Sequence, residues 1–261
     1  MDQAEIKQLL EKIVSNTEPK ESFYILVSDT NTRIRTRFNP LIQLDRSKKY
    51  EMALVNLETY YSFPNIDSTN NNIRYSPDNG TTWIGVDIPE GSYEITDIND
   101  YIQRIMKANG HYDYTNNQYH ISIQPNNNML KAVLDIGKNY KVDFTQANSI
   151  RTVLGFNSKI YSEGYNESEN IVNILSVNSL RVTSDVIGSS YTNGSTENII
   201  YSFFPNVAPG YKIVQEPLNL IYLPVTLQTI SKMETKLVDQ NGKLINLRGE
   251  ELSIRFHIRE A

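Results

Sequence analysis

Residues 73–88 read IRYSPDNGTTWIGVDI, and two runs with β-strand character flank an Asn-Gly pair at positions 79 and 80. Asn and Gly tolerate the positive φ angles of a tight type I′ turn, and this turn matches the twist of two paired strands. The same pair recurs at 193/194 and at 241/242, again between β-branched and aromatic residues. The chain is therefore predicted to contain three β-hairpins and to be mostly antiparallel sheet.

The carboxyl-terminal stretch supports the same fold class through strict alternation. Its apolar side chains point to one side of an extended strand, and the polar residues between them point to the other. One buried face and one exposed face are typical of a strand in a β-sandwich. The apolar residues are Leu252, Ile254, Phe256 and Ile258. Further strands are predicted at residues 23–27, 33–38, 48–63, 171–187 and 218–223.

Two internal segments have helical spacing instead. Near residues 96–109 the apolar side chains recur every three or four positions, which predicts one internal amphipathic helix. Thr96 or Asp97 can cap its start, and Gly110 suits the left-handed residue that follows a helix end. A short second helix is predicted at 148–154.

The amino-terminal segment also has the pattern of an amphipathic helix, which Pro19 ends. An isolated helix of this length is marginal in water, so its apolar stripe must dock on another surface. That surface is either the chain's own domain or a neighbouring subunit, and the stripe is therefore an interface candidate. Its residues are Ile6, Leu9, Leu10 and Ile13.

A row of arginines is the second interface candidate. Arg33, Arg35 and Arg37 alternate with less polar residues, and the period of two places all three on one side of a strand. Such a row can hold phosphate or carboxylate groups. An exposed face or a charged strand edge that discourages aggregation is the favoured interpretation.

Length and composition bound the other possibilities. At 261 residues, without a Gly/Ser linker or a repeat of fixed period, we expect an arm over 1–18 and one domain over 19–261. The net charge of -5 gives no general attraction to nucleic acid, and no apolar stretch approaches the length of a membrane span. The charged amino terminus does not have the pattern of a secretory signal, which favours synthesis in the cytosol.

Residues with the chemistry of an active site are few. The histidines are His111, His120 and His257, and none lies in a catalytic or metal-binding motif. The segment 239–251 has oxygen donors, but its spacing does not fit a calcium loop. We therefore expect no catalytic, metal or cofactor-binding residue, no cofactor and no enzyme activity. The 17 tyrosines suit either broad contact surfaces or ordinary β-strands.

A set of strings in the chain resembles the penton-type minor capsid proteins of Polinton (Maverick) elements and the related adintoviruses. The resemblance runs from about residue 22 to the carboxyl terminus. The strings are NPLIQLDRSKKYEMALVNLETYYSFPNI (39–66), RYSPDNGTTW (74–83), IPEGSYEITDINDYIQ (88–103), SFFPNVAPGYKIV (202–214), LIYLPV (220–225) and GEELSIRFHIRE (249–260).

This resemblance implies a single jelly-roll β-sandwich that forms a homopentamer at the fivefold vertices of an icosahedral double-stranded DNA virus or virus-like transposon. The partners that it implies are a double jelly-roll major capsid protein and further copies of the chain, with no specific nucleic acid. The implied location is the virion, after synthesis in the host cytosol and assembly there or in the nucleus. The chain length suggests little room for a further upper domain.

A carbohydrate- or receptor-binding β-sandwich module is the alternative function. The Tyr- and Asn-rich segments 111–120 and 188–198 favour it.

Overall fold

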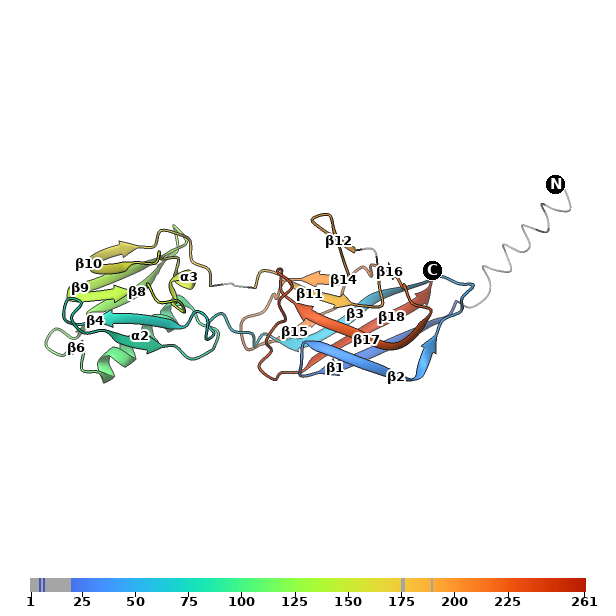
Figure 1. Cartoon of the computed structure of the whole chain (residues 1–261), viewed down its shortest axis with the longest axis horizontal. Helices are drawn as coiled ribbons and strands as arrows, with labels where there is room; N and C mark the ends of the chain where they lie inside the picture. The colour runs from blue at the N-terminus through green and yellow to red at the C-terminus, as the bar shows by residue number, and fades with distance from the viewer. Residues whose placement is uncertain (1–4, 6, 8–19, 175–176, 189) are drawn as a thin grey trace. The chain divides into compact units, whose positions relative to one another are not determined.

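A computed structural model describes residues 5, 7, 20–174, 177–188 and 190–261 (Figure 1). The chain divides into two compact units. Met1–Tyr61 and Ser179–Ala261 form the first, here called the sandwich unit, and Ser62–Asn178 form the second, here called the inserted unit. The sequence alone predicts one domain over 19–261 with little room for another. The structure differs because a whole unit, not only a helix, is inserted between two strands of the first.

The sandwich unit consists almost entirely of strands. Their bounds are β1 (Ser22–Asp29), β2 (Arg33–Gln43), β3 (Tyr50–Tyr60), β11 (Leu180–Ser184), β12 (Ser190–Thr192), β13 (Ser195–Glu197), β14 (Ile199–Phe203), β15 (Lys212–Gln215), β16 (Leu223–Pro224), β17 (Thr229–Val238) and β18 (Leu252–Glu260).

Eight of these strands pair in a nested order. The first strand pairs with the last, β1 with β18; β2 then pairs with β17, β3 with β15, and β11 with β14, all antiparallel. The strands form two sheets, the β1 sheet with order β1-β18-β3-β15 and the β2 sheet with order β14-β11-β17-β2. A nested pairing of eight strands across two sheets is the connectivity of a jelly roll. The predicted all-β sandwich is thus confirmed.

The core of the sandwich unit follows the predicted alternation. Leu252, Ile254, Phe256 and Ile258 are completely buried, while Arg255 between them is exposed. The neighbouring strands β1 and β3 contribute further buried side chains to the same side of the sheet. Because β18 buries every second residue, its remaining side chains point to the outer face of the β1 sheet.

The inserted unit combines a sheet with helices. Its elements are β4 (Asn72–Ser76), β5 (Ile84–Asp87), α2 (Ile95–Ala108), β6 (Tyr112–Asp113), β7 (Gln118–Tyr119), β8 (Ile121–Asn126), β9 (Lys131–Asp143), α3 (Arg151–Leu154) and β10 (Ile160–Glu167). The main sheet has the order β10-β9-β4-β5, with β8 also paired to β9, and α2 packs on β8. The apolar face of α2 enters the core of this unit.

Both predicted internal helices are present. The start of α2 is capped by Glu94, whose backbone N–H donates to the Asp97 carboxylate at 2.9 Å, so Asp97 takes part as the third helical residue. Gly110 has a φ of 80° and follows the helix end, as expected. The arm over 1–18, in contrast, lies almost wholly outside the described residues.

The predicted turns form with different loop lengths. Asn193 and Gly194 alone connect β12 and β13, and both have positive φ. The 79/80 pair lies in a longer loop between β4 and β5, and the 241/242 pair lies in the turn between Val238 and Leu244, which form an isolated bridge. The strand predicted at 218–223 is an exposed loop that becomes a strand only at Leu223.

Candidate interaction surfaces

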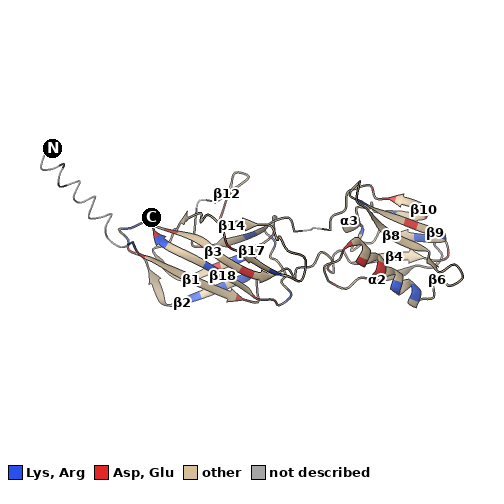
Figure 2. Ribbon diagram, turned by 180° about the vertical axis from the view of Figure 1, so that it is seen from behind, with Lys and Arg blue, Asp and Glu red and all other residues tan. Residues whose placement is uncertain are grey.

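The structure places the three predicted arginines on one edge strand. Arg33, Arg35 and Arg37 are exposed on β2, at the edge of the β2 sheet (Figure 2). The stripe of Ile6, Leu9, Leu10 and Ile13 cannot be placed, because these residues lie outside the described part of the chain. Of the two predicted interface candidates, the arginine row is therefore the one whose neighbouring residues the structure describes.

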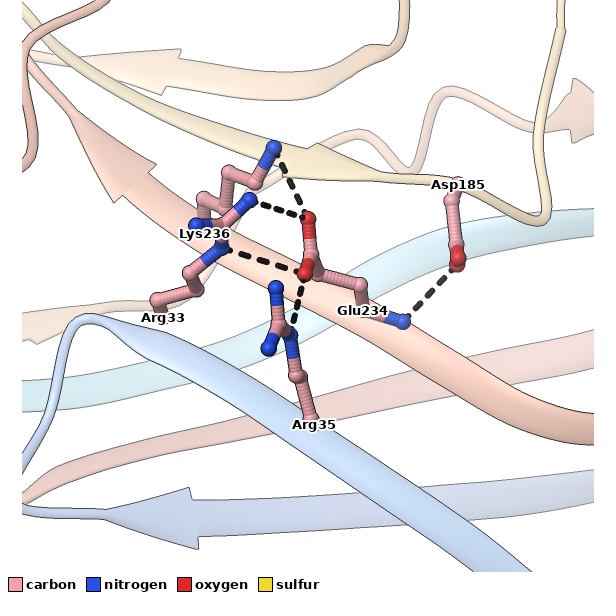
Figure 3. A network of polar contacts seen from close by, with 5 residues as sticks. All are labelled: Arg33, Arg35, Asp185, Glu234 and Lys236. Atoms are coloured by element: carbon pink, nitrogen blue, oxygen red, sulfur yellow. Dashed lines mark hydrogen bonds and ion pairs between the residues drawn. The ribbon is translucent and has the colours of Figure 1, made fainter.

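Two of these arginines pair with a carboxylate of their own chain. The cross-strand register sets Arg35 opposite Glu234 and Arg33 opposite Lys236. Glu234 Oε2 accepts hydrogen bonds from Arg35 Nε at 2.6 Å and from Arg33 Nε at 3.1 Å, and Lys236 Nζ lies 2.8 Å from Glu234 Oε1 (Figure 3). The Glu234 carboxylate thus forms ion pairs with three cationic side chains.

Glu234 is held in place from its backbone as well. Its N–H donates to the Asp185 carboxylate at 2.8 Å. The hydrogen bonds from Lys236, Arg35 and Arg33 lower the pKa of the Glu234 carboxyl to about 2. The group is therefore ionised well into the acidic range, and its charge holds the network together.

Further along the same face the charges are not balanced. Arg37 lies directly opposite Lys232, and neither forms an ion pair with the described residues. Like charges directly opposite one another on paired strands are unfavourable. An open groove of about 650 Å³ adjoins the network, between β17, the β12–β13 hairpin and the turn at 240–242. Around Arg37 and Lys232, this outer face of the β2 sheet can attract an anionic group such as a carboxylate or a phosphate.

We expect Glu234→Gln to change how the stability of the sandwich unit depends on pH. A carboxyl whose pKa is lower in the folded protein stabilises the fold above its unfolded pKa and loses this contribution as the pH falls toward about 2. The wild type should therefore lose urea resistance between about pH 4.5 and pH 2 more steeply than Glu234→Gln. The control is Glu250→Gln, whose exposed side chain has no ion pair in the described structure. Equal slopes for wild type and Glu234→Gln would contradict the prediction.

The outer face of the β1 sheet has a different character. Its centre is His257, which stacks on Tyr24 at 4.8 Å between ring centroids and lies 2.7 Å from the Tyr222 hydroxyl through Nδ1. The guanidinium of Arg259 lies 3.5 Å from the centroid of the Tyr222 ring. Burial, together with the positive charge of Arg259, lowers the pKa of His257. His257 is therefore a polar cross-strand neighbour of Tyr24.

Large apolar side chains are exposed on both borders of this face. Tyr24 and Leu26 are 63% and 60% exposed on β1. Leu218 and Ile221 are exposed in the loop between β15 and β16, the loop that the sequence analysis assigned to a strand. Exposed apolar residues that gather on one face are typical of a surface that meets another molecule. The apolar residues of 218–223 mark this segment in the sequence, but their spacing alone does not distinguish a strand of the core from an exposed loop.

The inserted unit has an exposed aromatic cluster of its own. The rings of Tyr112 and Tyr119 lie 4.7 Å apart, and those of Tyr112 and Tyr114 lie 4.9 Å apart. The ammonium group of Lys107 lies 4.5 Å from the centre of the Tyr112 ring, in a cation–π contact. Tyr114 is 72% exposed. The three tyrosines are in the Tyr- and Asn-rich segment 111–120 that favoured a binding module.

The described residues contain no group of three or more acidic or histidine side chains that could hold a metal ion. None of their helices is long and apolar enough to cross a membrane.

Comparison with known proteins gives no family assignment. No family model matches the chain, and no curated protein matches its sequence. Among solved structures, the chain is similar to the penton protein of mavirus, with a TM-score of 0.49 and 9% identity over 92% of this chain and 100% of that one. It also matches the D2–D3 domains of the flagellar cap protein FliD from Escherichia coli, with a TM-score of 0.15 and 12% identity over 84% and 100% of the two chains. Both TM-scores lie below 0.5, so neither likeness establishes the fold or the function of this chain.

Proposed function

We propose that this protein is a penton-type minor capsid protein, the fivefold vertex subunit of an icosahedral double-stranded DNA virus or virus-like transposon of the Polinton and adintovirus kind. The observation that carries the proposal is the nested pairing of β1, β2, β3 and β11 with β18, β17, β15 and β14. Jelly rolls with this connectivity are a recurrent solution for capsid subunits. The strings quoted above supply the link to this family, since fold alone does not give function.

The two outer faces of the sandwich unit suit a ring of identical subunits. A head-to-tail contact joins two different patches of the same protein. Repeated contacts close into a ring when the rotation from one subunit to the next adds up to a full turn. The outer face of the β2 sheet is basic around Arg37 and Lys232, whereas the outer face of the β1 sheet exposes apolar residues on its borders. The chain therefore offers two unlike surfaces, as such a contact requires.

The remaining partners follow from the same proposal. The ring would sit beside a double jelly-roll major capsid protein in the virion, and the apolar stripe of residues 1–18 would contribute contacts to a neighbouring subunit. Arg37, which has no ion pair among the described residues, is the member of the arginine row best placed to pair with an acidic neighbour.

We expect the isolated chain to form closed five-membered rings at high protein concentration. Light scattering and electron microscopy of the full chain would measure the stoichiometry, and each contact should bury more than about 1,000 Å². Removal of residues 1–18 should weaken the ring while the strands stay folded, and added salt should weaken it if exposed charge pairs contribute. A monomer at all concentrations, without fivefold images, would overturn the proposal.

A carbohydrate- or receptor-binding role remains the second candidate, because the tyrosine cluster on the inserted unit favours it. Tyrosine rings provide contact area together with a hydroxyl that can bond to a ligand. Binding to a glycan array by the full chain, lost in Tyr114→Ser and kept in Tyr165→Ser, would support this role. Tyr165 is the matched control because it is exposed to a similar extent, 68% against 72%.

A further inference from the structure

The sandwich unit has four sheet edges, and three of them carry features that discourage strand pairing. β2 presents three arginines and Pro40, and its register with β17 is interrupted between Ile230 and Lys232. β14 has an irregular register with β11, and Ser190 Oγ accepts a hydrogen bond from its Ile199 N–H at 2.8 Å. β15 has only four residues. Charges, proline, bulges and short length are the usual protections of an exposed edge.

β1 lacks all of these protections. Residues 22–28 read SFYILVS, without a charge or a proline, and the register with β18 is uninterrupted from Ser22 to Asp29. In the described part of the chain, no strand pairs with the other side of β1. A long, apolar and unprotected edge strand is a ready template for another strand.

The register identifies the backbone groups that face this open side. The Glu260 N–H donates to the Glu21 carbonyl at 2.9 Å, and these two residues continue the register of β1 with β18. In an antiparallel ladder such hydrogen-bonded pairs alternate with non-bonded pairs. Odd-numbered residues of β1 therefore bond to β18, while Ser22, Tyr24, Leu26 and Ser28 direct their N–H and C=O groups to the open side.

We propose that β1 is a docking site for an extended segment of a partner protein, which adds a strand to the β1 sheet. The open N–H and C=O groups of β1 would supply the ladder, as in other cases of strand addition. The exposed side chains of Tyr24 and Leu26 select apolar residues at alternate positions of the incoming strand. This inference concerns the sheet edge alone and does not depend on the ring proposed above.

The charges at the ends of β1 identify the partner further. Glu21 precedes the strand and Asp29 ends it, so the incoming segment should carry lysine or arginine at its ends. A second copy of β1 fits less well. In the antiparallel register that overlaps the whole strand, Glu21 of one copy lies opposite Asp29 of the other at both ends, and like charges directly opposite are destabilising.

A capped nonapeptide, Lys-Val-Thr-Val-Thr-Val-Thr-Val-Lys, is a suitable probe for the full chain. In the antiparallel register its end lysines lie opposite Glu21 and Asp29, and its valines share the outer face with Tyr24 and Leu26. The measurement is amide hydrogen exchange resolved by residue. The peptide should slow exchange of the Tyr24 and Leu26 amides by at least about tenfold, because these amides gain a hydrogen-bond partner. The amides of Ile25 and Val27, which already bond to β18, should change little.

Two substitutions at Leu26 test the site, with a matched control. Leu26→Pro removes an N–H that faces the open side, so it costs no hydrogen bond to β18. Leu26→Lys keeps the N–H but adds a charge to the edge. Both should weaken peptide binding at least about tenfold, a change of about 1.4 kcal/mol. Leu41→Lys, which replaces an exposed leucine on the edge strand β2, should leave binding unchanged.

Three outcomes would overturn the inference. The first is that the peptide does not slow exchange of the Tyr24 and Leu26 amides. The second is that Leu26→Lys and Leu41→Lys lose the same amount of peptide affinity. The third is that protection of these amides rises with protein concentration in the absence of peptide, which would identify a second copy as the occupant. Light scattering of Leu26→Lys at high protein concentration measures ring formation separately. Failure of strand addition is thereby distinguished from failure of the proposed vertex role.

Discussion

Phe256→Ala is expected to lower the free energy of unfolding of the sandwich unit by about 3–5 kcal/mol, whereas Arg255→Ala should change it by no more than about 0.5 kcal/mol. The Phe256 side chain is completely buried and lies in register with Ile25 of β1 and Leu54 of β3. Removing its ring leaves a cavity that neighbours in two strands cannot fill. Arg255 points to the outer face of the same strand and is exposed.

The measurement can separate the two units. The single tryptophan of the chain, Trp83, lies in the inserted unit, so its fluorescence follows that unit, while far-UV circular dichroism follows both. In urea, Phe256→Ala should shift a transition seen by dichroism and leave the fluorescence midpoint near that of the wild type. Similar losses for Phe256→Ala and Arg255→Ala would mean that the two faces of β18 are assigned incorrectly.

The strands could be predicted from the sequence where one face of each is buried. Alternation in β18 predicted both its extent and its buried side, because burial against a single core imposes a period of two. The same reasoning was insufficient for 218–223, where the apolar residues lie in an exposed loop. An apolar pattern indicates that the side chains favour burial, but it does not show whether they are buried in the core of their own chain or against another molecule.

The division into two units could not be read from composition. The chain leaves the sandwich unit after Tyr61 and returns at Ser179, and neither connecting segment is a Gly/Ser linker. The division depends on pairing between strands that are far apart in the sequence, such as β3 with β15. A local sequence pattern contains no information on such pairing.

The arginine row shows a similar limit. Period two placed Arg33, Arg35 and Arg37 on one side of β2, and the structure agrees. Their partner Glu234 is 199 residues from Arg35 in sequence, so only the register of β2 with β17 reveals it. The sequence therefore predicted the chemistry of this face but not how much of its charge is neutralised within the chain.

Gly155→Ala should destabilise the inserted unit by about 2–5 kcal/mol. Gly155 follows α3 with a φ of 83°, a left-handed conformation that costs an L-residue about 1–2 kcal/mol. A Cβ atom at this position would also lie 2.3 Å from the Asn170 carbonyl oxygen and 2.9 Å from that of Ile171. These are backbone atoms, so the segment itself must move, and such overpacking typically adds about 1–3 kcal/mol.

Gly110→Ala is the matched control, because Gly110 is in the same unit and has a φ of 80° but nothing within 4 Å of an added Cβ. Gly110→Ala should lower the free energy of unfolding only by the cost of the left-handed backbone conformation, about 1–2 kcal/mol. The urea midpoint of Trp83 fluorescence should therefore fall further in Gly155→Ala than in Gly110→Ala. Segment 170–171 also forms the Asn170 N–H to Gly155 C=O hydrogen bond of 2.9 Å, so its displacement removes a backbone bond as well. Equal midpoints in the two variants would show that this segment moves aside without cost and that the close approach at Gly155 does not hold the inserted unit together.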